Sequence, residues 1–381
     1  MCYTYLFYPF ILWVLSKFKN QALDTFGETD DLPFVSVIMP VHNEESVLND
    51  KIHSLKQLHY PKDKIIFYIG SDASNDYTNA ILHTEFDFAK VYFNTNRTGK
   101  PGMVNILVSK AFEFKPAGPD HILLFTDASV MLEPSCLFHL VKYYKNPKMG
   151  LVDANMQNLG IKKDNISFAE SSYVSMEVKI KHWESIVFNK MVGPFGGCFT
   201  IRSNYFEPIP DNFLVDDFYL CMQVFKKSGW AINSIEALSY ESVSQELREE
   251  FRRKSRIASG NIQNLSYFNY FLSKDFRDSV FAIYSHKVIR WFVPVLALIF
   301  YISLSMLSIS HQQPFFNILV SITIILICIP LLEIIFSKLK IVVSPIKSLN
   351  YFLWMNVALL KGFFGYLKGI KSNVWKPTKR Y

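Results

Sequence analysis

The chain contains little of what marks several common protein classes. Its five cysteines are scattered and include no CxxC pair, which argues against a disulfide framework or a zinc site and favours a reducing compartment. No tract of Lys and Arg interleaved with aromatic residues accompanies the net charge of +7, so the basic excess does not indicate nucleic-acid binding. The first apolar run has neither a basic stretch before it nor a small-residue cleavage site after it, so we expect no cleaved signal peptide.

Apolar residues, by contrast, are abundant and unevenly spread. They make up 50% of the 381 residues, and long apolar runs are concentrated after residue 287. Residues 291–309 carry no formal charge and are long enough to span a membrane, and residues 315–336 form a second span with only Glu333 near its end. Basic residues lie outside both runs, which predicts a hairpin with its outer flanks in the cytoplasm.

Two further apolar segments leave alternatives open. As a helix, residues 3–15 reach only about 20–25 Å, against about 30 Å for the hydrocarbon core. They form either a short spanning helix or a helix lying in the interface. Residues 349–370 carry Lys361 and Lys368 on one helical face and precede a basic tail, which favours an amphipathic helix on the cytoplasmic surface over a third span.

Strand and helix patterns alternate between residue 34 and about residue 240. Strand patterns occur at residues 35–40, 64–70, 91–93 and 121–126, and helical patterns at residues 45–58 and 100–112. This alternation predicts an α/β domain with a mostly parallel sheet, in which ligands bind beyond the carboxyl ends of the strands. The expected segments are a membrane or interfacial helix at 1–19, the α/β domain at 34–245, interfacial helices at 246–286, the membrane hairpin at 287–340, and a C-terminal helix with its tail at 347–381.

Acidic residues stand at three points where such a domain binds ligands. Asp72 and Asp127 each end a strand pattern, and Asp216 and Asp217 begin a helical one. Taken singly, each has a structural explanation, because acids cap turns and helix N-termini. A strand-end Asp also suits a hard divalent cation that shares a diphosphate, and adjacent carboxylates raise one another's pKa, which suits a general base.

Basic residues that would bind a phosphate group follow the same order. Lys100 lies between two glycines at a helix start, although the spacing is not that of a Walker loop. Arg253 and Arg256 are three apart, so one helical face would present both to a diphosphate or to an anionic membrane surface.

Taken together and in this order, the motifs resemble the family 2 glycosyltransferases of the GT-A fold, which is Rossmann-like. The resemblance covers residues 34–290 and is nearest to the membrane-embedded branch with the cellulose, chitin and hyaluronan synthases. It implies that Asp127 binds the metal, that Asp217 is the catalytic base with Asp216 beside it, and that residues 195–202 form a loop at the acceptor end. The donor-binding residues that it implies, Asp72 among them for the uracil, are Pro40, Asn43, Glu44, Asp72, Lys100, Asn105, Arg253 and Arg256.

The chain also departs from that branch. Ser129 replaces the second carboxylate of the DxD-type metal motif, and Arg253 and Ile257 replace the Gln and Trp associated with chain extension.

The resemblance implies an inverting transfer of a hexose or N-acetylhexosamine from a UDP-sugar, with Mg²⁺ or Mn²⁺. The acceptor would be a lipid-linked sugar or oligosaccharide, or a growing cell-surface polysaccharide. Membrane lipids and synthase or export subunits would be partners, and the catalytic domain would face the cytoplasm, at a bacterial inner membrane. The alternatives are a catalytically inactive subunit of the same fold and a small transporter. The transporter is disfavoured because the spans carry no ionisable residue besides Glu333.

Overall fold

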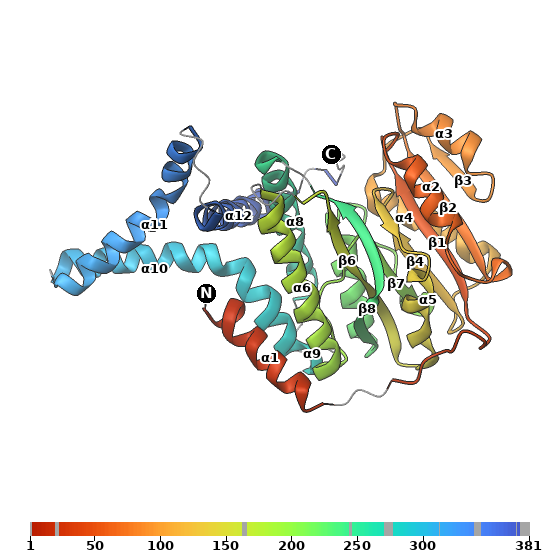
Figure 1. Ribbon diagram of the computed structural model, residues 1–381, viewed down its shortest axis with the longest axis horizontal. Coiled ribbons are helices and arrows are strands. Elements are labelled where there is room, and N and C mark those ends of the chain that lie inside the picture. Colours follow the sequence, from red (N-terminus) through yellow and green to blue (C-terminus); the bar gives the residue numbers. More distant parts are fainter. Residues whose placement is uncertain are drawn as a thin grey trace.

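A mixed eight-stranded sheet lies on one side of the computed structural model, and a pair of long helices projects from the opposite side (Figure 1). The structure describes residues 2–19, 23–161, 166–243, 246–269, 277–311, 313–338, 344–370 and 372–373. Lys340, the side chain of Glu333 and the basic tail after residue 373 therefore lie outside the described residues. The strands are β1 (Phe34–Val41), β2 (Ile65–Asp72), β3 (Lys90–Asn94), β4 (His121–Thr126), β5 (Val130–Leu132), β6 (Met149–Leu159), β7 (Cys198–Arg202) and β8 (Trp230–Ser242).

The strand order is β3-β2-β1-β4-β7-β6-β8-β5. Pairs β1–β2, β1–β4, β2–β3 and β6–β8 are parallel, whereas β4–β7, β6–β7 and β5–β8 are antiparallel. The sheet is therefore mixed, and only its first half, β3-β2-β1-β4, is wholly parallel, as the alternation predicts. Residues 198–202, expected in a loop, instead form β7 at the centre of the sheet. All five are buried, because β7 is covered on both faces.

Helices cover both faces of the sheet. They are α2 (Leu48–Lys56), α3 (Thr78–Glu85), α4 (Gly99–Phe114), α5 (Cys136–Val141) and α7 (Asp216–Lys226), with short 3-10 turns at Lys62–Lys64, Lys142–Lys145 and Ser203–Tyr205. Because side chains alternate along a strand, Ile38 of β1 packs with α4 and α7, whereas Val37 and Met39 pack with α2, α3 and α5. This two-sided core holds the carboxyl ends of β1, β2 and β4 at one edge.

A second group of helices lies against the other end of the sheet. It comprises η1 (Tyr3–Phe7), α1 (Tyr8–Lys17), α6 (Ile166–Phe188), α8 (Leu247–Tyr267), α9 (Arg277–Ala282), η6 (Ile283–Val288), α10 (Ile289–His311), α11 (Pro314–Lys338) and α12 (Ser344–Leu367). Tyr8 and Leu12 of α1 pack on Ile180 and Val187 of α6. Helix α12 lies against α8, where Ser259 Oγ donates to the Gly362 carbonyl at 2.7 Å.

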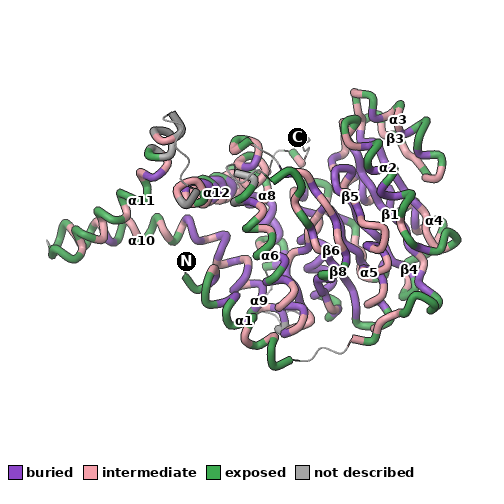
Figure 2. The backbone as a smooth tube through the Cα atoms, in the orientation of Figure 1, coloured by how far each residue is buried: buried purple, intermediate pink, exposed green. Residues whose placement is uncertain are grey.

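The projecting helix is the part of the described chain that suits a membrane. Residues Ser279–His311 form the single helix among the described residues that is long and apolar enough to cross one, judged by length and composition. Figure 2 shows that the outer part of α10 is largely exposed, unlike the buried strands of the sheet. The apolar part of α11, Pro314–Pro330, is shorter.

Candidate functional site

Asp72, the last residue of β2, holds the start of α4 in place. Its carboxylate is fully buried and accepts hydrogen bonds from the Thr98 amide (2.7 Å), the Thr98 hydroxyl (3.0 Å) and the Gly99 amide (2.9 Å). Arg97 Nε lies 3.9 Å from the same carboxylate. Gly99 has a φ of +78°, a conformation that side-chain-bearing residues rarely adopt. Asp72 thus caps α4 and fixes the backbone that precedes Lys100.

Lys100 joins acidic side chains from two separate elements. Its Nζ lies 2.9 Å from Asp127 Oδ1 and 3.6 Å from Asp216 Oδ2, and it donates to the Gly196 carbonyl at 3.3 Å. Burial alone lowers the pKa of Lys100, but the charges of Asp127 and Asp216 outweigh it and hold that pKa above its usual value. Lys100 is therefore a stable cation at the point where the ends of β4 and α7 meet.

Asp217, in the first turn of α7, has a pKa suited to proton transfer near neutral pH. Burial, and then the negative charge of Asp216, raise the pKa of Asp217 to about 7, while Lys100 opposes them. A Cβ at Gly196 would lie 2.3 Å from Asp217 Oδ2, so the backbone at residue 196 forms the wall against which this carboxylate lies. A carboxylate with this pKa can act as a general base.

Helix α8 supports the loop before α7. The Leu214 amide donates to Gln263 Oε1 at 3.2 Å, and Asn264 Nδ2 donates to the Val215 carbonyl at 3.0 Å. Asn264 is fully buried. No local sequence pattern marks Gln263 or Asn264, because their partners lie about 50 residues earlier in the chain.

The loop that carries Gly196 is supported from β6 and α6. Asp153 Oδ1 accepts the Phe195 amide at 2.6 Å, and Glu184 Oε2 accepts the Val192 amide at 3.1 Å. Lys181 donates to the second oxygen of Asp153 at 2.5 Å. These buried side chains were also missed, and no local sequence pattern points to them.

Below the turn that carries Asp127 lies a buried lysine. Lys51 of α2 is fully buried, and its Nζ donates to Thr126 Oγ1 at 2.7 Å and to the Val130 carbonyl at 2.5 Å. It therefore holds both ends of the Asp127 turn. The sequence contains a signal for it, because Lys51 falls on the same helical face as Leu48 and Leu55, where an apolar residue is expected.

The two arginines of α8 have different surroundings. Arg253 Nη2 lies 2.8 Å from Glu170 Oε1 and 3.0 Å from Glu250 Oε2. Arg256 Nη1 donates to the Leu214 carbonyl at 3.1 Å. Burial lowers the pKa of Arg256, and the charges of Asp216 and Asp217 oppose that shift. Arg256 is therefore next to the acidic pair, whereas Arg253 is bound to two carboxylates.

Besides Asp72, two of the expected donor-binding residues make structural contacts and do not line the cavity described below. Asn43 has a φ of 54° and exchanges hydrogen bonds with Asn75, at 2.7 Å and 2.9 Å. Asn105 exchanges hydrogen bonds with the backbone of Ile209, at 2.7 Å and 2.9 Å. In the described structure both asparagines hold loops at the edge of the site.

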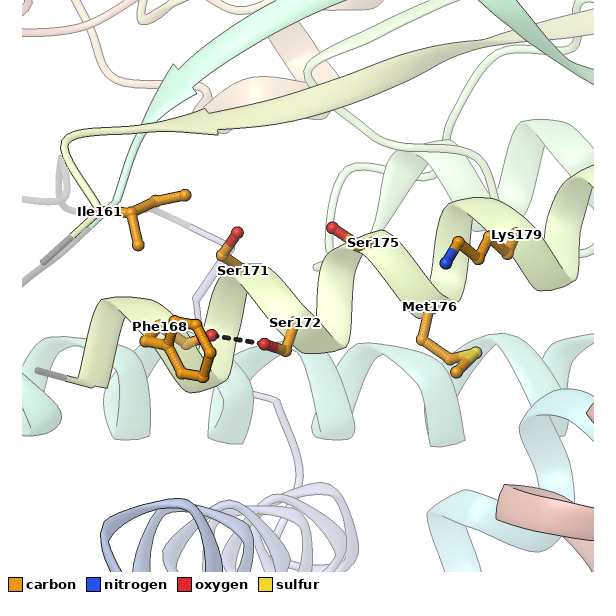
Figure 3. A pocket seen from close by; sticks show the side chains of 7 residues that line it. All are labelled: Ile161, Phe168, Ser171, Ser172, Ser175, Met176 and Lys179. Atoms are coloured by element: carbon orange, nitrogen blue, oxygen red, sulfur yellow. Dashed lines mark hydrogen bonds between the residues drawn. The ribbon is translucent and has the colours of Figure 1, made fainter. Parts of the chain in front are cut away.

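One cavity of about 630 Å³ brings most of the expected residues together. The expected residues that line it are Pro40, Glu44, Lys100, Asp127, Asp216, Asp217, Arg253 and Arg256. It continues along α6 to the junction of η1, α10 and α12, where its lining includes Tyr5, Trp291 and Leu359. A second cavity, of about 500 Å³, lies along the outer side of α6 and contains none of the expected residues (Figure 3).

The acidic residues of the larger cavity suit a divalent cation that is bound together with a substrate. Among the described residues no group of three or more His, Cys, Asp or Glu side chains is placed to hold a metal ion by itself. Asp127 and Asp216 both reach the single ammonium group of Lys100, so hard oxygen donors converge there. One or two carboxylates completed by phosphate oxygens and water are the usual Mg²⁺ environment, and the residues present fit it.

Comparison with known proteins shows that part of the chain is similar to glycosyltransferases. Residues 36–209 match the family model "Glycosyl transferase family 2". The "Probable glycosyltransferase YdaM" of Bacillus subtilis is 25% identical over 249 residues, which are 61% of this chain and 56% of that protein. The "Beta-monoglucosyldiacylglycerol synthase" of Trichormus variabilis is 26% identical over 178 residues, 45% of this chain and 35% of that protein. The chain thus spans about half the length, or less, of these curated relatives.

A solved structure supports the fold. The mannosyltransferase PcManGT from Pyrobaculum calidifontis, in complex with GDP-Man and Mn²⁺, superposes with a TM-score of 0.66 at 18% identity and covers 94% of each chain. The expectation of a GT-A-like α/β fold is therefore confirmed. The match to the family model extends over less than half of the chain and supports the expected glycosyltransferase. The nearer resemblance to cellulose, chitin and hyaluronan synthases stays a prediction.

Proposed function

We propose that this chain, which has a GT-A-like fold, is a family 2 glycosyltransferase that transfers a hexose or N-acetylhexosamine from a UDP-sugar to a lipid-linked acceptor or growing cell-surface saccharide. The observation that carries the proposal is the position of Asp217. Its carboxylate lies in the same cavity as Lys100 and Asp127, and that cavity continues to the helix that is long and apolar enough to cross a membrane. A donor, a base and an entering lipid would meet there.

The proposed reaction is a single in-line displacement. An acceptor hydroxyl oxygen attacks C1 of the donor sugar, and the bond between C1 and the diphosphate oxygen breaks with its electron pair leaving on the diphosphate. Asp217 takes the hydroxyl proton as the new bond forms, so the configuration at C1 inverts. Its pKa of about 7 lets it be ionised at neutral pH and still accept a proton.

The donor diphosphate would lie at the N-terminus of α4. That helix end carries Lys100, and the positive end of the helix dipole adds to its attraction for anions. Arg256, beside the acidic pair, would approach the same diphosphate. A divalent cation, Mg²⁺ or Mn²⁺, would be held by Asp127 and would supply further neutralisation of the leaving group. The role of Asp72 towards a uracil stays a prediction.

The membrane location is part of the proposal. Helix α10 would span the bilayer, and the basic residues near its start would keep the catalytic domain on the cytoplasmic side. Apolar side chains of the N-terminal helix, among them Leu6, Phe7 and Phe10, are exposed on its outer side, which suits a helix lying in the interface.

A second candidate function is a non-catalytic subunit that binds a synthase partner or a lipid-linked sugar. It is favoured by Ser129, which replaces a carboxylate in the metal motif. It is also favoured by the ion pairs of Arg253 with Glu170 and Glu250, because these pairs take up the guanidinium that would bind a diphosphate.

Nucleotide release separates the two functions. Full-length protein in detergent is given UDP-glucose, UDP-N-acetylglucosamine, UDP-galactose or GDP-mannose with a cell lipid extract, with and without Mn²⁺. We expect metal-dependent release of UDP from one donor, reduced about 10²–10⁴-fold in Asp217→Asn. Asp211→Asn, a change at an exposed carboxylate in the same loop, is the matched control and should keep activity. Near-wild-type release by Asp217→Asn contradicts the assignment, and UDP binding without turnover would establish the non-catalytic function.

A further inference from the structure

The end of the cavity nearest the projecting helix combines aromatic and charged side chains. Tyr5 of η1, Tyr173 of α6 and Trp291 of α10 line it. The cations at this end are Lys287 and Arg290, which lie at the start of the apolar helix. An acceptor that enters from a bilayer would meet this end before it reached Asp217.

Glu177 of α6 forms ion pairs with both cations at this end. Its carboxylate binds Lys287 Nζ at 2.7 Å and the Arg290 guanidinium, and His286 Nε2 lies 3.1 Å away. Burial by itself raises the pKa of Glu177, but Lys287 and Arg290 outweigh it and keep that pKa well below its usual range. Arg290 also donates to the hydroxyl and carbonyl of Thr4, each at 3.2 Å. Its hydrogen-bonding groups are thus directed to protein atoms.

Glu170 repeats this arrangement two turns earlier on α6. It accepts Arg253 at 2.8 Å and Lys254 at 3.0 Å, and the Tyr351 hydroxyl also donates to it. Burial raises the pKa of Glu170, and the charges of Lys254 and Arg253 outweigh it and lower that pKa to about 2. Both carboxylates are therefore ionised at neutral pH, and each holds two cations that would otherwise be offered to a ligand.

We propose that the acceptor entering this end of the cavity is a lipid with an uncharged, hydroxyl-bearing headgroup, such as a neutral glycerolipid or glycolipid, and that Glu177 excludes anionic headgroups. A phosphate placed beside Lys287 and Arg290 would meet the Glu177 carboxylate in a partly buried site, where like charges repel strongly. To pair with those cations the phosphate would have to displace Glu177, whereas the hydroxyl of an uncharged headgroup needs only one hydrogen bond. The inference rests on the proposed transferase function and narrows its acceptor.

The test compares lipids that differ in headgroup charge. Full-length protein in mixed micelles receives dioleoylglycerol or dioleoylphosphatidylglycerol, both of which offer primary hydroxyls, together with radiolabelled UDP-glucose, UDP-N-acetylglucosamine or GDP-mannose. We expect label in the neutral lipid at a rate at least tenfold higher than in the anionic one. In Glu177→Gln we expect the ratio of anionic to neutral labelling to rise at least tenfold. Glu85→Gln, at an exposed carboxylate of α3, is the control and should leave the ratio unchanged.

Each outcome has a defined meaning. Equal or faster labelling of phosphatidylglycerol by the wild type overturns the inference but leaves the transferase function in place. Label that appears in a water-soluble oligosaccharide and in neither lipid also overturns the inference and leaves the transferase function in place. Absence of nucleotide release with every donor and acceptor contradicts the proposed function itself. If Glu177→Gln does not fold, Glu170→Gln serves as the second variant, and an unchanged ratio in a folded variant contradicts the role of the paired carboxylates.

Discussion

Gly196 and Asp217 are in such close contact that the glycine has no room for a side chain. A Cβ at residue 196 would lie 2.3 Å from Asp217 Oδ2 and 3.1 Å from its Cγ. The Gly196 carbonyl in turn accepts a hydrogen bond from Lys100 at 3.3 Å. The backbone at Gly196 thus contacts both Asp217, the proposed base, and Lys100, which is proposed to bind the donor diphosphate.

We expect Gly196→Ala to lower kcat by about 10²-fold, because a displacement of about 1 Å at a reacting group costs about that much. The added methyl group must push the Asp217 carboxylate away from its position. Gly118→Ala is the matched control, since nothing lies within 4 Å of a Cβ at that position. Steady-state nucleotide release measures both variants. Full activity in a folded Gly196→Ala protein would show that the position of Asp217 does not limit the reaction.

The acid limb of the pH–rate profile should report Asp217. The base works only when ionised, and burial together with Asp216 raises its pKa to about 7. Activity should therefore fall as the pH drops below about 7, by about tenfold per unit at low pH. An unperturbed Asp would place that limb near pH 4. Transfer rates between pH 5 and 8.5 at saturating donor measure it, and a flat profile down to pH 5 contradicts the assignment.

Local patterns located the first half of the sheet and the acids at its edge. Apolar runs that end at Asp72 and Asp127 are visible without any tertiary information, and the structure brings Lys100, Asp127 and Asp217 into one cavity. Strand β7 was not located, because its pairing with β4 and β6 joins residues far apart in the chain. The supports of the site, such as Glu184 for the Val192 amide, were invisible for the same reason.

Resemblance alone also did not reveal how Asp72 and Asn105 are bound. Both were expected at the nucleotide, yet Asp72 accepts three hydrogen bonds at the start of α4 and Asn105 exchanges two with Ile209. Arg202, the last residue of the acceptor loop expected at 195–202, donates to backbone carbonyls of Met149, Pro119, Tyr144 and Asn146. Such contacts depend on which segments the fold brings together.

Replacing Asp72 should affect both stability and donor binding. Asp72→Ala leaves the buried amides of Thr98 and Gly99 without their acceptor, which costs about 1–3 kcal/mol of unfolding free energy. The start of α4 then loosens, so Lys100 is held less well and the donor KM should rise. Asp87→Asn, at an exposed residue that lies 3.8 Å from Lys56, is the control. Melting temperature and donor KM are measured for each protein. If both values for Asp72→Ala equal those of the wild type, the capping role is contradicted.

Lys51 should make the stability of the protein depend on pH in the alkaline range. Burial lowers the pKa of Lys51 to about 8, against 10.5 for an exposed lysine. No carboxylate lies within 4.0 Å of it among the described residues. Between these two pH values the unfolded chain binds a proton that the folded chain does not. The free energy of unfolding therefore rises with pH across this window, by about 1.4 kcal/mol per pH unit at most. Below about pH 8 Lys51 is protonated in both the folded and the unfolded chain, so the folded protein bears the full free-energy cost of burying this charge.

Lys51→Met removes this titration, so the melting temperature of the wild type relative to the variant should increase from pH 7.5 to pH 9.5. Lys56→Met, at an exposed residue on the same helix, is the matched control and should show no such change. The variant also leaves Thr126 Oγ1 and the Val130 carbonyl without their donor, so the Asp127 turn loosens and the donor KM should rise. Parallel melting curves for wild type and Lys51→Met across this pH range would show that Lys51 is not a buried, titrating cation.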